Sequence, residues 1–435
     1  MTLETFWFIV ITVLWTGFFV LEGFDLGVGM LHGVLGKDEA GRRAAINTIG
    51  PLWDGNEVWL IVAGAGMFAA FPGWYATMFS GFYVAMVLLL LALIARGVSF
   101  EFRSKQDSPR WRRTWDGLMT GGSVLVALLI GVALGNLLHG VPIGQNQEFT
   151  GSLVDLLNPY SLFVGVTLLL LCVLQGATFL SLKTTADLRQ RSAKLARQTA
   201  PVAGLAVLIF AVWTHIVSGR GVIPNLFQFT AVIAVIASAW LLRERATGWS
   251  FAATSVAISS TILALFVDLY PRVMVSSTNP AYSLTIQNTA SGTYALKVMT
   301  VVTVILFPTV LVYQGWTYHV FRARVSTDTF SGSGKPVPAP RTAPGGAGSM
   351  RSAQPDTELA AGPRDRRLLR RGAPASRYLA VATAIAAGLA ALVVLSRTGM
   401  RPHRWAAARV KSQLRRDLRT PPVGVVGQAP APLSD

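Results

Sequence analysis

The sequence feature that most restricts the fold is a series of nine apolar runs, most of them long enough to cross a lipid bilayer as a helix. A bilayer core about 30 Å thick needs roughly 20 apolar residues in a helix. Inside it, only helices and closed barrels satisfy their own backbone hydrogen bonds. Only 14% of the residues are charged, against roughly 25% in soluble domains. The chain is therefore predicted to be an all-α integral membrane protein with nine transmembrane helices.

The predicted spans run approximately from Phe6 to Leu31, Glu57 to Phe71, Trp74 to Ala95, Leu118 to Leu138, Tyr160 to Leu182, Ala200 to Val217, Phe227 to Leu242, Phe251 to Leu269 and Leu296 to Val320. Alternate loops, together with the segment after the ninth span, carry 18 Lys and Arg, whereas the other side has only Arg220, Arg272 and Lys297. Lys and Arg accumulate in cytoplasmic loops. We therefore expect the N-terminus outside and the end of the ninth span inside. The first apolar run has no basic residue before it and no small-residue cleavage site before Glu22, so we expect it to be a retained span rather than a signal peptide.

We expect residues 1–325 to form one membrane domain, in which spans one to four and five to eight make two four-helix bundles and the ninth helix is peripheral. Residues 326–375 are rich in Gly, Pro, Ser and Arg, a composition typical of a flexible linker. Residues 376–435 form a basic tail with a tenth apolar run, Tyr378 to Leu395. That run is either a further span or a helix on the membrane surface, since spanning would place a basic C-terminus outside, against the charge rule.

The net charge of +17 does not indicate nucleic-acid binding, because of where the charge lies. From Lys335 onward the tail holds 17 basic and 5 acidic residues, or +12, and the body, with 21 basic and 16 acidic residues, is left at +5. The body's basic residues fall in loops. The single cysteine, Cys172, lies in an apolar run; it excludes a disulfide framework and cysteine-based metal sites, and it is more typical of packing.

Four acidic residues interrupt the apolar pattern where the first predicted span ends and the second begins: Glu22, Asp25, Asp54 and Glu57. Each pair has a spacing of three residues, which places both carboxyls on one face of a helix. A charge at bilayer depth costs roughly 3 kcal/mol on insertion scales and by default indicates function. Four carboxylates at one depth repel and share protons, which favours a proton relay. The alternative for Asp54 and Glu57 is a capping box at a helix start.

The aromatic residues and histidines leave two further questions open. Trp53, Trp59 and Trp74 are either interfacial belt residues or, for Trp53 and Trp59, an aromatic wall for a quinone ring. A bis-histidine haem needs two histidines at one depth. The histidines, which are His32, His139, His215, His319 and His403, lie at the ends of predicted helices rather than in their middles. The pairs are not excluded, but haem ligation by this chain is not favoured, and no metal site is predicted.

With these residues in hand, the chain resembles subunit II of the cytochrome bd-type quinol oxidases over residues 1 to about 325. The similarity is carried in order by segments 22–29, 53–59, 79–86 (Phe-Ser-Gly-Phe-Tyr-Val-Ala-Met), 135–142 (Gly-Asn-Leu-Leu-His-Gly-Val-Pro), 175–180, 276–278 and 297–300. The tail has no counterpart in that subunit, and the loop Ser218 to Gln228 is short compared with some relatives.

The resemblance implies a subunit of a terminal oxidase in the bacterial cytoplasmic membrane, paired with a subunit I that holds haem b and haem d and oxidises quinol. It implies that protons are taken from the cytoplasm, with Asp54 and Asp25 candidates on their route. It also implies a structural quinone near Trp59 in some members, and leaves small single-helix accessory subunits open. The alternatives are a secondary transporter, for which the expected inverted repeats and broken helices are not seen in the sequence, and a purely structural membrane partner.

Overall fold

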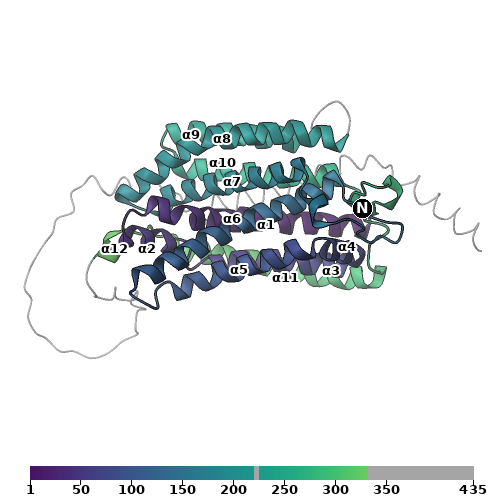
Figure 1. The fold of residues 1–435 in the computed structure, drawn as a ribbon, viewed down its shortest axis with the longest axis horizontal. Helices are drawn as coiled ribbons and strands as arrows, with labels where there is room; N and C mark the ends of the chain where they lie inside the picture. The colour runs from purple at the N-terminus through teal and green to yellow at the C-terminus, as the bar shows by residue number, and fades with distance from the viewer. Residues whose placement is uncertain (220–224, 332–435) are drawn as a thin grey trace, which may run out of the picture. The chain divides into compact units, whose positions relative to one another are not determined.

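The computed structural model describes residues 1–219 and 225–331, and this part of the chain is almost entirely helical (Figure 1). The long helices are α1 (Leu3–Leu35), α3 (Trp53–Ala70), α5 (Tyr83–Phe102), α6 (Pro109–His139), α7 (Pro159–Lys183), α8 (Ala186–Ser218), α9 (Leu226–Arg243), α10 (Thr247–Leu269) and α11 (Thr293–Val320). Shorter helices are α2 (Glu39–Asn47), α4 (Pro72–Gly81) and α12 (Asp328–Ser331), with 3₁₀ turns η1 (Leu153–Leu156) and η2 (Pro280–Tyr282). The predicted linker from residue 332, the tail and its tenth apolar run lie outside the described residues.

Within the described residues, eight helices are long and apolar enough to cross a membrane: α1, α5, α6, α7, α8, α9, α10 and α11. The helix α3 corresponds to the second predicted span. It has 18 residues, but Asp54, Asn56 and Glu57 in its first turns lower its hydropathy. The prediction of an all-α membrane protein is therefore confirmed.

The third predicted span, Trp74 to Ala95, is not one continuous helix. It is divided at Phe82 between α4 and α5. Next to the break, Gly81 lies so close to Phe149 that an added Cβ would be 2.6 Å from the ring. The ring of Phe149, a loop residue, therefore occupies the space that any side chain at position 81 would need. The helix α5 also extends past the predicted end of the span, to Phe102.

Two polar helical segments were missed because hydropathy alone finds only membrane-length apolar runs. The helix α8 begins at Ala186, not at Ala200, so Arg189 and its basic neighbours lie on a helix rather than in a loop. The ion pair between Arg191 and Asp187, one turn apart at 3.4 Å, supports this extension. The helix α2 begins after Asp38, whose side chain accepts a hydrogen bond from the backbone N–H of Gly41 at 2.7 Å.

The polar segment between α10 and α11 contains a small antiparallel sheet that caps the helix ends. Strand β1 (Arg272–Met274) pairs with β2 (Leu284–Thr285), with Arg272 opposite Thr285 and Met274 opposite Leu284. Ser277 donates a backbone hydrogen bond to Val141 at 2.9 Å. This cap therefore covers the C-terminal end of α6.

The helix α1 is buried over most of its length and contacts α3, α6, α7 and α10 (Figure 1). Its closest crossing is with α7, where an added Cβ on Gly27 would lie 2.0 Å from the carbonyl oxygen of Cys172 and 2.8 Å from Gly176. Small residues at such crossings let helix backbones approach each other. The helix α11 is largely exposed and contacts α1 and α3. The polar residues of α1 are consequently held at a fixed position in the middle of the packed helices.

Candidate functional site

The two acidic residues of α1 lie in the interior of the protein. Both Glu22 and Asp25 have fully buried side chains (0% exposed). An ionised carboxylate removed from water is costly unless a counter-charge or hydrogen-bond donor lies beside it. The structure supplies both, from α5 and from α3.

The counter-charge is Arg96 of α5, which is also fully buried. One guanidinium nitrogen lies 2.6 Å from Oε1 of Glu22, and the other lies 2.8 Å from Oε2 of Glu57 on α3. Arg96 therefore joins α1, α3 and α5. Assigning Arg96 to a loop from the sequence was wrong, because α5 continues beyond Ala95 and carries this residue into the site.

The hydrogen-bond donor is Asn56 of α3, a fully buried residue. Its Nδ2 lies 2.6 Å from Oδ2 of Asp25. Asn56 was not singled out from the sequence, although it stands between Asp54 and Glu57. The structure thus brings together Glu22, Asp25 and Glu57 with one arginine and one amide, which we call the carboxylate cluster (Glu22, Asp25, Glu57, Arg96 and Asn56). Three carboxyls facing one guanidinium favour retention of protons in the cluster.

The fourth predicted acid, Asp54, does not enter the cluster. Its side chain is exposed, and among the described residues no hydrogen bond or ion pair to it is found, although its charge acts on Glu57 one turn later. The N-cap of α3 is Leu52, without a side-chain hydrogen bond. The capping-box interpretation of Asp54 and Glu57 was therefore wrong, because the helix begins before Asp54 and the Glu57 carboxyl is bound by Arg96.

The tryptophans near the cluster pack against protein side chains. Trp53 stacks on Phe100 of α5, with ring centroids 4.7 Å apart and an interplanar angle of 8°. Trp59 is 5% exposed and fits against Gly17 of α1, where an added Cβ would lie 2.3 Å from its ring. Trp74 is fully buried, unlike an interfacial belt residue. Quinone contact by Trp53 and Trp59 stays a prediction.

A second polar group connects the ends of α1, α2, α5 and α6. Asp116 of α6 lies 3.1 Å from Nε2 of His32 and 2.5 Å from Nε of Arg103, and Arg103 also forms a 2.9 Å pair with Glu39. Burial by itself would lower the pKa of Arg103, but its hydrogen bonds to Glu39 and Asp116 raise that pKa above its ordinary value. These contacts connect α1, α2, α5 and α6 near the carboxylate cluster.

His32 in this group is bound through both ring nitrogens. Nδ1 lies 2.8 Å from the carbonyl oxygen of Gly29, and Nε2 faces Asp116. A haem ligand needs one free ring nitrogen, so His32 does not fit this role. No group of three or more His, Cys, Asp or Glu able to hold a metal ion occurs in the described ranges 1–219 and 225–331.

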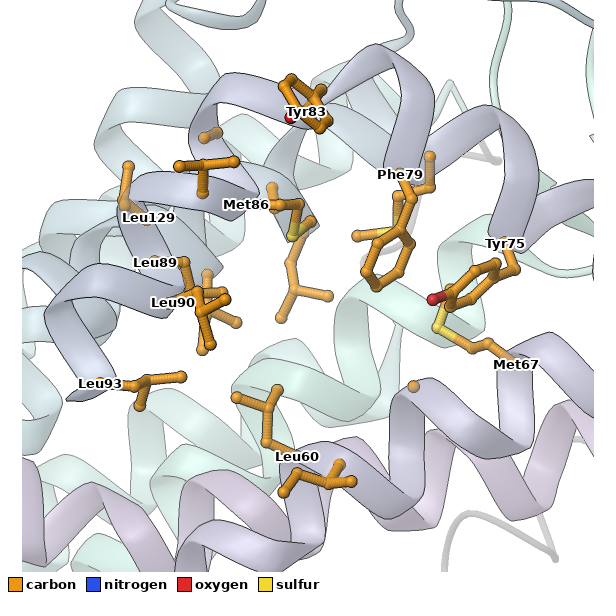
Figure 2. Close-up of a pocket in the computed structure, with 18 of the residues that line it drawn as sticks. Leu60, Met67, Tyr75, Phe79, Tyr83, Met86, Leu89, Leu90, Leu93 and Leu129 are labelled. Carbon is orange, nitrogen blue, oxygen red and sulfur yellow. The ribbon is translucent and has the colours of Figure 1, made fainter. Parts of the chain in front are cut away.

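An apolar cavity of about 620 Å³ lies beside α3 and is also lined by α1, α4, α5 and α6 (Figure 2). Figure 2 shows Leu60 of α3 on one side and Phe79, Met86 and Leu90 from α4 and α5 on the other. Trp15 of α1 also lines it, and this indole is 6% exposed with an Nε1 that has no hydrogen-bond partner. The lining of the cavity is therefore suited to an apolar ligand.

Comparison with known proteins is consistent with these features. Residues 3–321 match the family described as cytochrome bd terminal oxidase subunit II. The chain is 44% identical over 329 residues to cytochrome bd ubiquinol oxidase subunit 2 of Bacillus subtilis, covering 75% of this chain and 97% of the relative. It is 38% identical over 367 residues to cytochrome bd-I ubiquinol oxidase subunit 2 of Escherichia coli K12, covering 75% and 96%.

Among solved structures, the fold is similar to a chain of the bd oxidase from Geobacillus thermodenitrificans, with a TM-score of 0.58, 18% identity, and coverage of 72% of this chain and 98% of that one. The match of fold agrees with the helices described above. The chain belongs to the family of cytochrome bd terminal oxidase subunit II.

Proposed function

We propose that this chain pairs with a haem-bearing subunit I in a quinol:dioxygen oxidoreductase of the bacterial cytoplasmic membrane, and that it carries protons from the cytoplasmic side toward the site of oxygen reduction. In this arrangement the N-terminus lies outside, spans one to four and five to eight form two four-helix bundles, and α11 is peripheral. The exposed apolar faces of the helices contact lipid, subunit I and any small single-helix accessory subunits.

The observation that carries the proposal is the position of the acids. Glu22 and Asp25 are fully buried, Glu57 is one-fifth exposed, and Asp54 is exposed one turn before Glu57 on the same helix. The exposure of these carboxyls thus increases stepwise from the interior, at Glu22 and Asp25, to the surface of the chain, at Asp54. A proton relay needs titratable groups at such intervals. Three buried or partly buried carboxyls whose charge is neutralised only in part by one arginine would destabilise the fold, and a purely structural role does not explain them.

The haems are expected on subunit I. In the complex, haem b and haem d supply the oxygen-reducing chemistry, while the residues of this chain hold and move protons. His32 is bound on both ring nitrogens, and His139 lies against Tyr160 with ring centroids 5.9 Å apart. Because both ring nitrogens of His32 are bound, the pair of His32 and His319 does not fit a bis-histidine haem.

The apolar cavity beside α3 is a second candidate place for a structural quinone, besides the predicted one at Trp53 and Trp59. The apolar lining would hold the isoprenoid chain of a quinone. We expect about one quinone per complex to survive detergent washing, measured by solvent extraction and chromatography. A washed, active complex that holds no quinone would contradict this assignment.

Asp54→Asn tests the proposed proton route at its exposed end. The complex should assemble, because no hydrogen bond or ion pair to Asp54 is found among the described residues. Oxygen consumption with quinol should nevertheless fall by about tenfold. That is less than the roughly 10²- to 10⁴-fold of general acid–base catalysis, because water can partly replace a surface carboxyl. Asp187→Asn, which changes an exposed acid on α8, is the matched control. Unchanged turnover in an assembled Asp54→Asn complex would remove Asp54 from the route.

We also propose that residues 332–435 are dispensable for this function. The family match ends at residue 321 and the relatives are covered almost completely by three quarters of this chain. The cut is placed after Ser331 because α12 still contacts α2. A chain ending at Ser331 should assemble with subunit I and retain turnover within about twofold, measured by haem content and oxygen uptake; loss of assembly would show that the tail contributes to the complex.

A further inference from the structure

Asn56 makes four hydrogen bonds from a fully buried position between α1, α3 and α11. Its Nδ2 donates to Oδ2 of Asp25 at 2.6 Å and to the carbonyl oxygen of Leu21 at 3.1 Å. Its Oδ1 accepts from Nε2 of Gln314 at 2.8 Å and from the hydroxyl of Tyr318 at 2.9 Å. Every donor and acceptor of the amide is therefore satisfied.

The orientation of this amide follows from its partners. A backbone carbonyl oxygen such as that of Leu21 can only accept a hydrogen bond, so Nδ2 must face α1 and Oδ1 must face α11. In this orientation Oδ2 of Asp25 receives an N–H, while the reverse orientation would place two oxygens against each other. The contacts thus select a single arrangement of the Asp25 carboxyl.

The two oxygens of Asp25 consequently differ. Oδ2 is bound by Asn56, whereas Oδ1 is buried and, among the described residues, receives no hydrogen bond from an N–H group; the neighbouring carboxyl of Glu22 lies within hydrogen-bonding reach of Asp25. We propose that Asn56 is a positioning residue that reserves Oδ1 of Asp25 for the transferred proton, and that Tyr318 and Gln314 of α11 hold Asn56 in place. This inference rests on the proposed function of Asp25 as a proton carrier.

The proton balance of the step is simple. When Asp25 is protonated, the O–H bond is on Oδ1 and Oδ2 remains the carbonyl oxygen that accepts from Asn56. When Oδ1 releases the proton to the neighbouring carboxylate of Glu22, the negative charge left on Asp25 is stabilised by the same N–H and by the charge of Arg96. The other titratable groups that face this site are Glu22 on α1, Glu57 on α3 and Tyr318 on α11, with Cys172 on α7 beside Glu22.

The helix α11 bears on this site because it supplies both donors to Oδ1 of Asn56. This helix contacts only α1 and α3 appreciably. At its other end, Nε1 of Trp7 donates to Thr300 at 3.1 Å. Near the carboxylate cluster, Gln314 and Tyr318 donate hydrogen bonds to Asn56, and at the C-cap of α11 the backbone carbonyl oxygen of Phe321 accepts a hydrogen bond from Lys183 of α7. A displacement of α11 would therefore release Asn56 and, through it, Asp25.

The test is Asn56→Leu in the complete complex, because leucine has nearly the shape of asparagine but no donor. We expect the pH dependence of quinol-supported oxygen consumption to move to higher pH by about one unit, since a carboxylate without its donor holds a proton more tightly. In infrared difference spectra, the C=O stretching band that Asp25→Asn abolishes should move to higher wavenumber. Tyr318→Phe, which removes one of the two donors onto Asn56, should shift both readouts in the same direction but less.

Trp7→Phe is the matched control, because it removes one hydrogen bond between α1 and the opposite end of α11 and leaves Gln314 and Tyr318 bound to Asn56; it should change neither readout. An unchanged pH dependence and an unchanged carboxyl band in Asn56→Leu would overturn the inference. If the Asn56→Leu complex does not assemble, the same two readouts are measured in Tyr318→Phe. The absence of a shift in Tyr318→Phe would then overturn the inference. Normal turnover in Asp25→Asn would instead contradict the proposed function itself, so the two failures are distinguishable.

Discussion

Asp25→Asn is expected to lower quinol-supported oxygen consumption by roughly 10²- to 10⁴-fold, the range for loss of a positioned general acid or base. The substitution keeps the volume of the side chain, and an asparagine oxygen can still accept from Asn56, which lies 2.6 Å from Oδ2. The group that is lost is the titratable one. The measurement is oxygen uptake by a complex whose haem content shows complete assembly.

Cys172→Ala provides the control for this substitution. Cys172 is a buried thiol on α7 whose Sγ lies close to Gly23 of α1, so its truncation disturbs the same helix contact without removing a carboxyl. This variant should keep turnover within about threefold, because a small cavity costs stability rather than proton transfer. Turnover of Asp25→Asn at the level of Cys172→Ala would contradict the relay.

Arg96→Met should cause the largest loss of stability of any single substitution in the cluster. It leaves Glu22 and Glu57 without the guanidinium that lies 2.6 Å and 2.8 Å away. Removing one partner of a buried ion pair costs about 3–5 kcal/mol. We expect little assembled complex, measured by size-exclusion chromatography in detergent and by the temperature at which the haem spectrum is lost.

The combination of Arg96→Met with Glu22→Gln should recover part of that stability, because the uncompensated charge of Glu22 is then also gone. It should not recover turnover. Arg112→Met is the matched control: Arg112 is about one-quarter exposed and pairs with the fully exposed Asp107, and exposed pairs contribute about 0–1 kcal/mol. If Arg96→Met were as stable as Arg112→Met, the charge balance described for the cluster would be wrong.

Several features of this protein were predictable from the sequence because they depend on local chemistry. The bilayer requires long apolar helices, so nearly every span was found in its approximate place. The spacing of Glu22 and Asp25 placed them on one face of one helix, and a helix keeps that relation whatever surrounds it. The ordered segments from 22–29 to 297–300 indicated the family, which comparison confirmed.

The composition of the site was decided by tertiary structure. Hydropathy ended the third span before Arg96, yet α5 continues and its packing turns that arginine toward α1. The spacing of Asp54 and Glu57 suggested a shared role, yet one is exposed and the other binds Arg96. Sequence alone determined approximately where the long apolar helices lie and which residues share a face of one helix, because those are properties of one segment. Which side chains meet, and which acid receives the single buried cation, depends on how separate helices rotate and cross, and only the folded structure decided that.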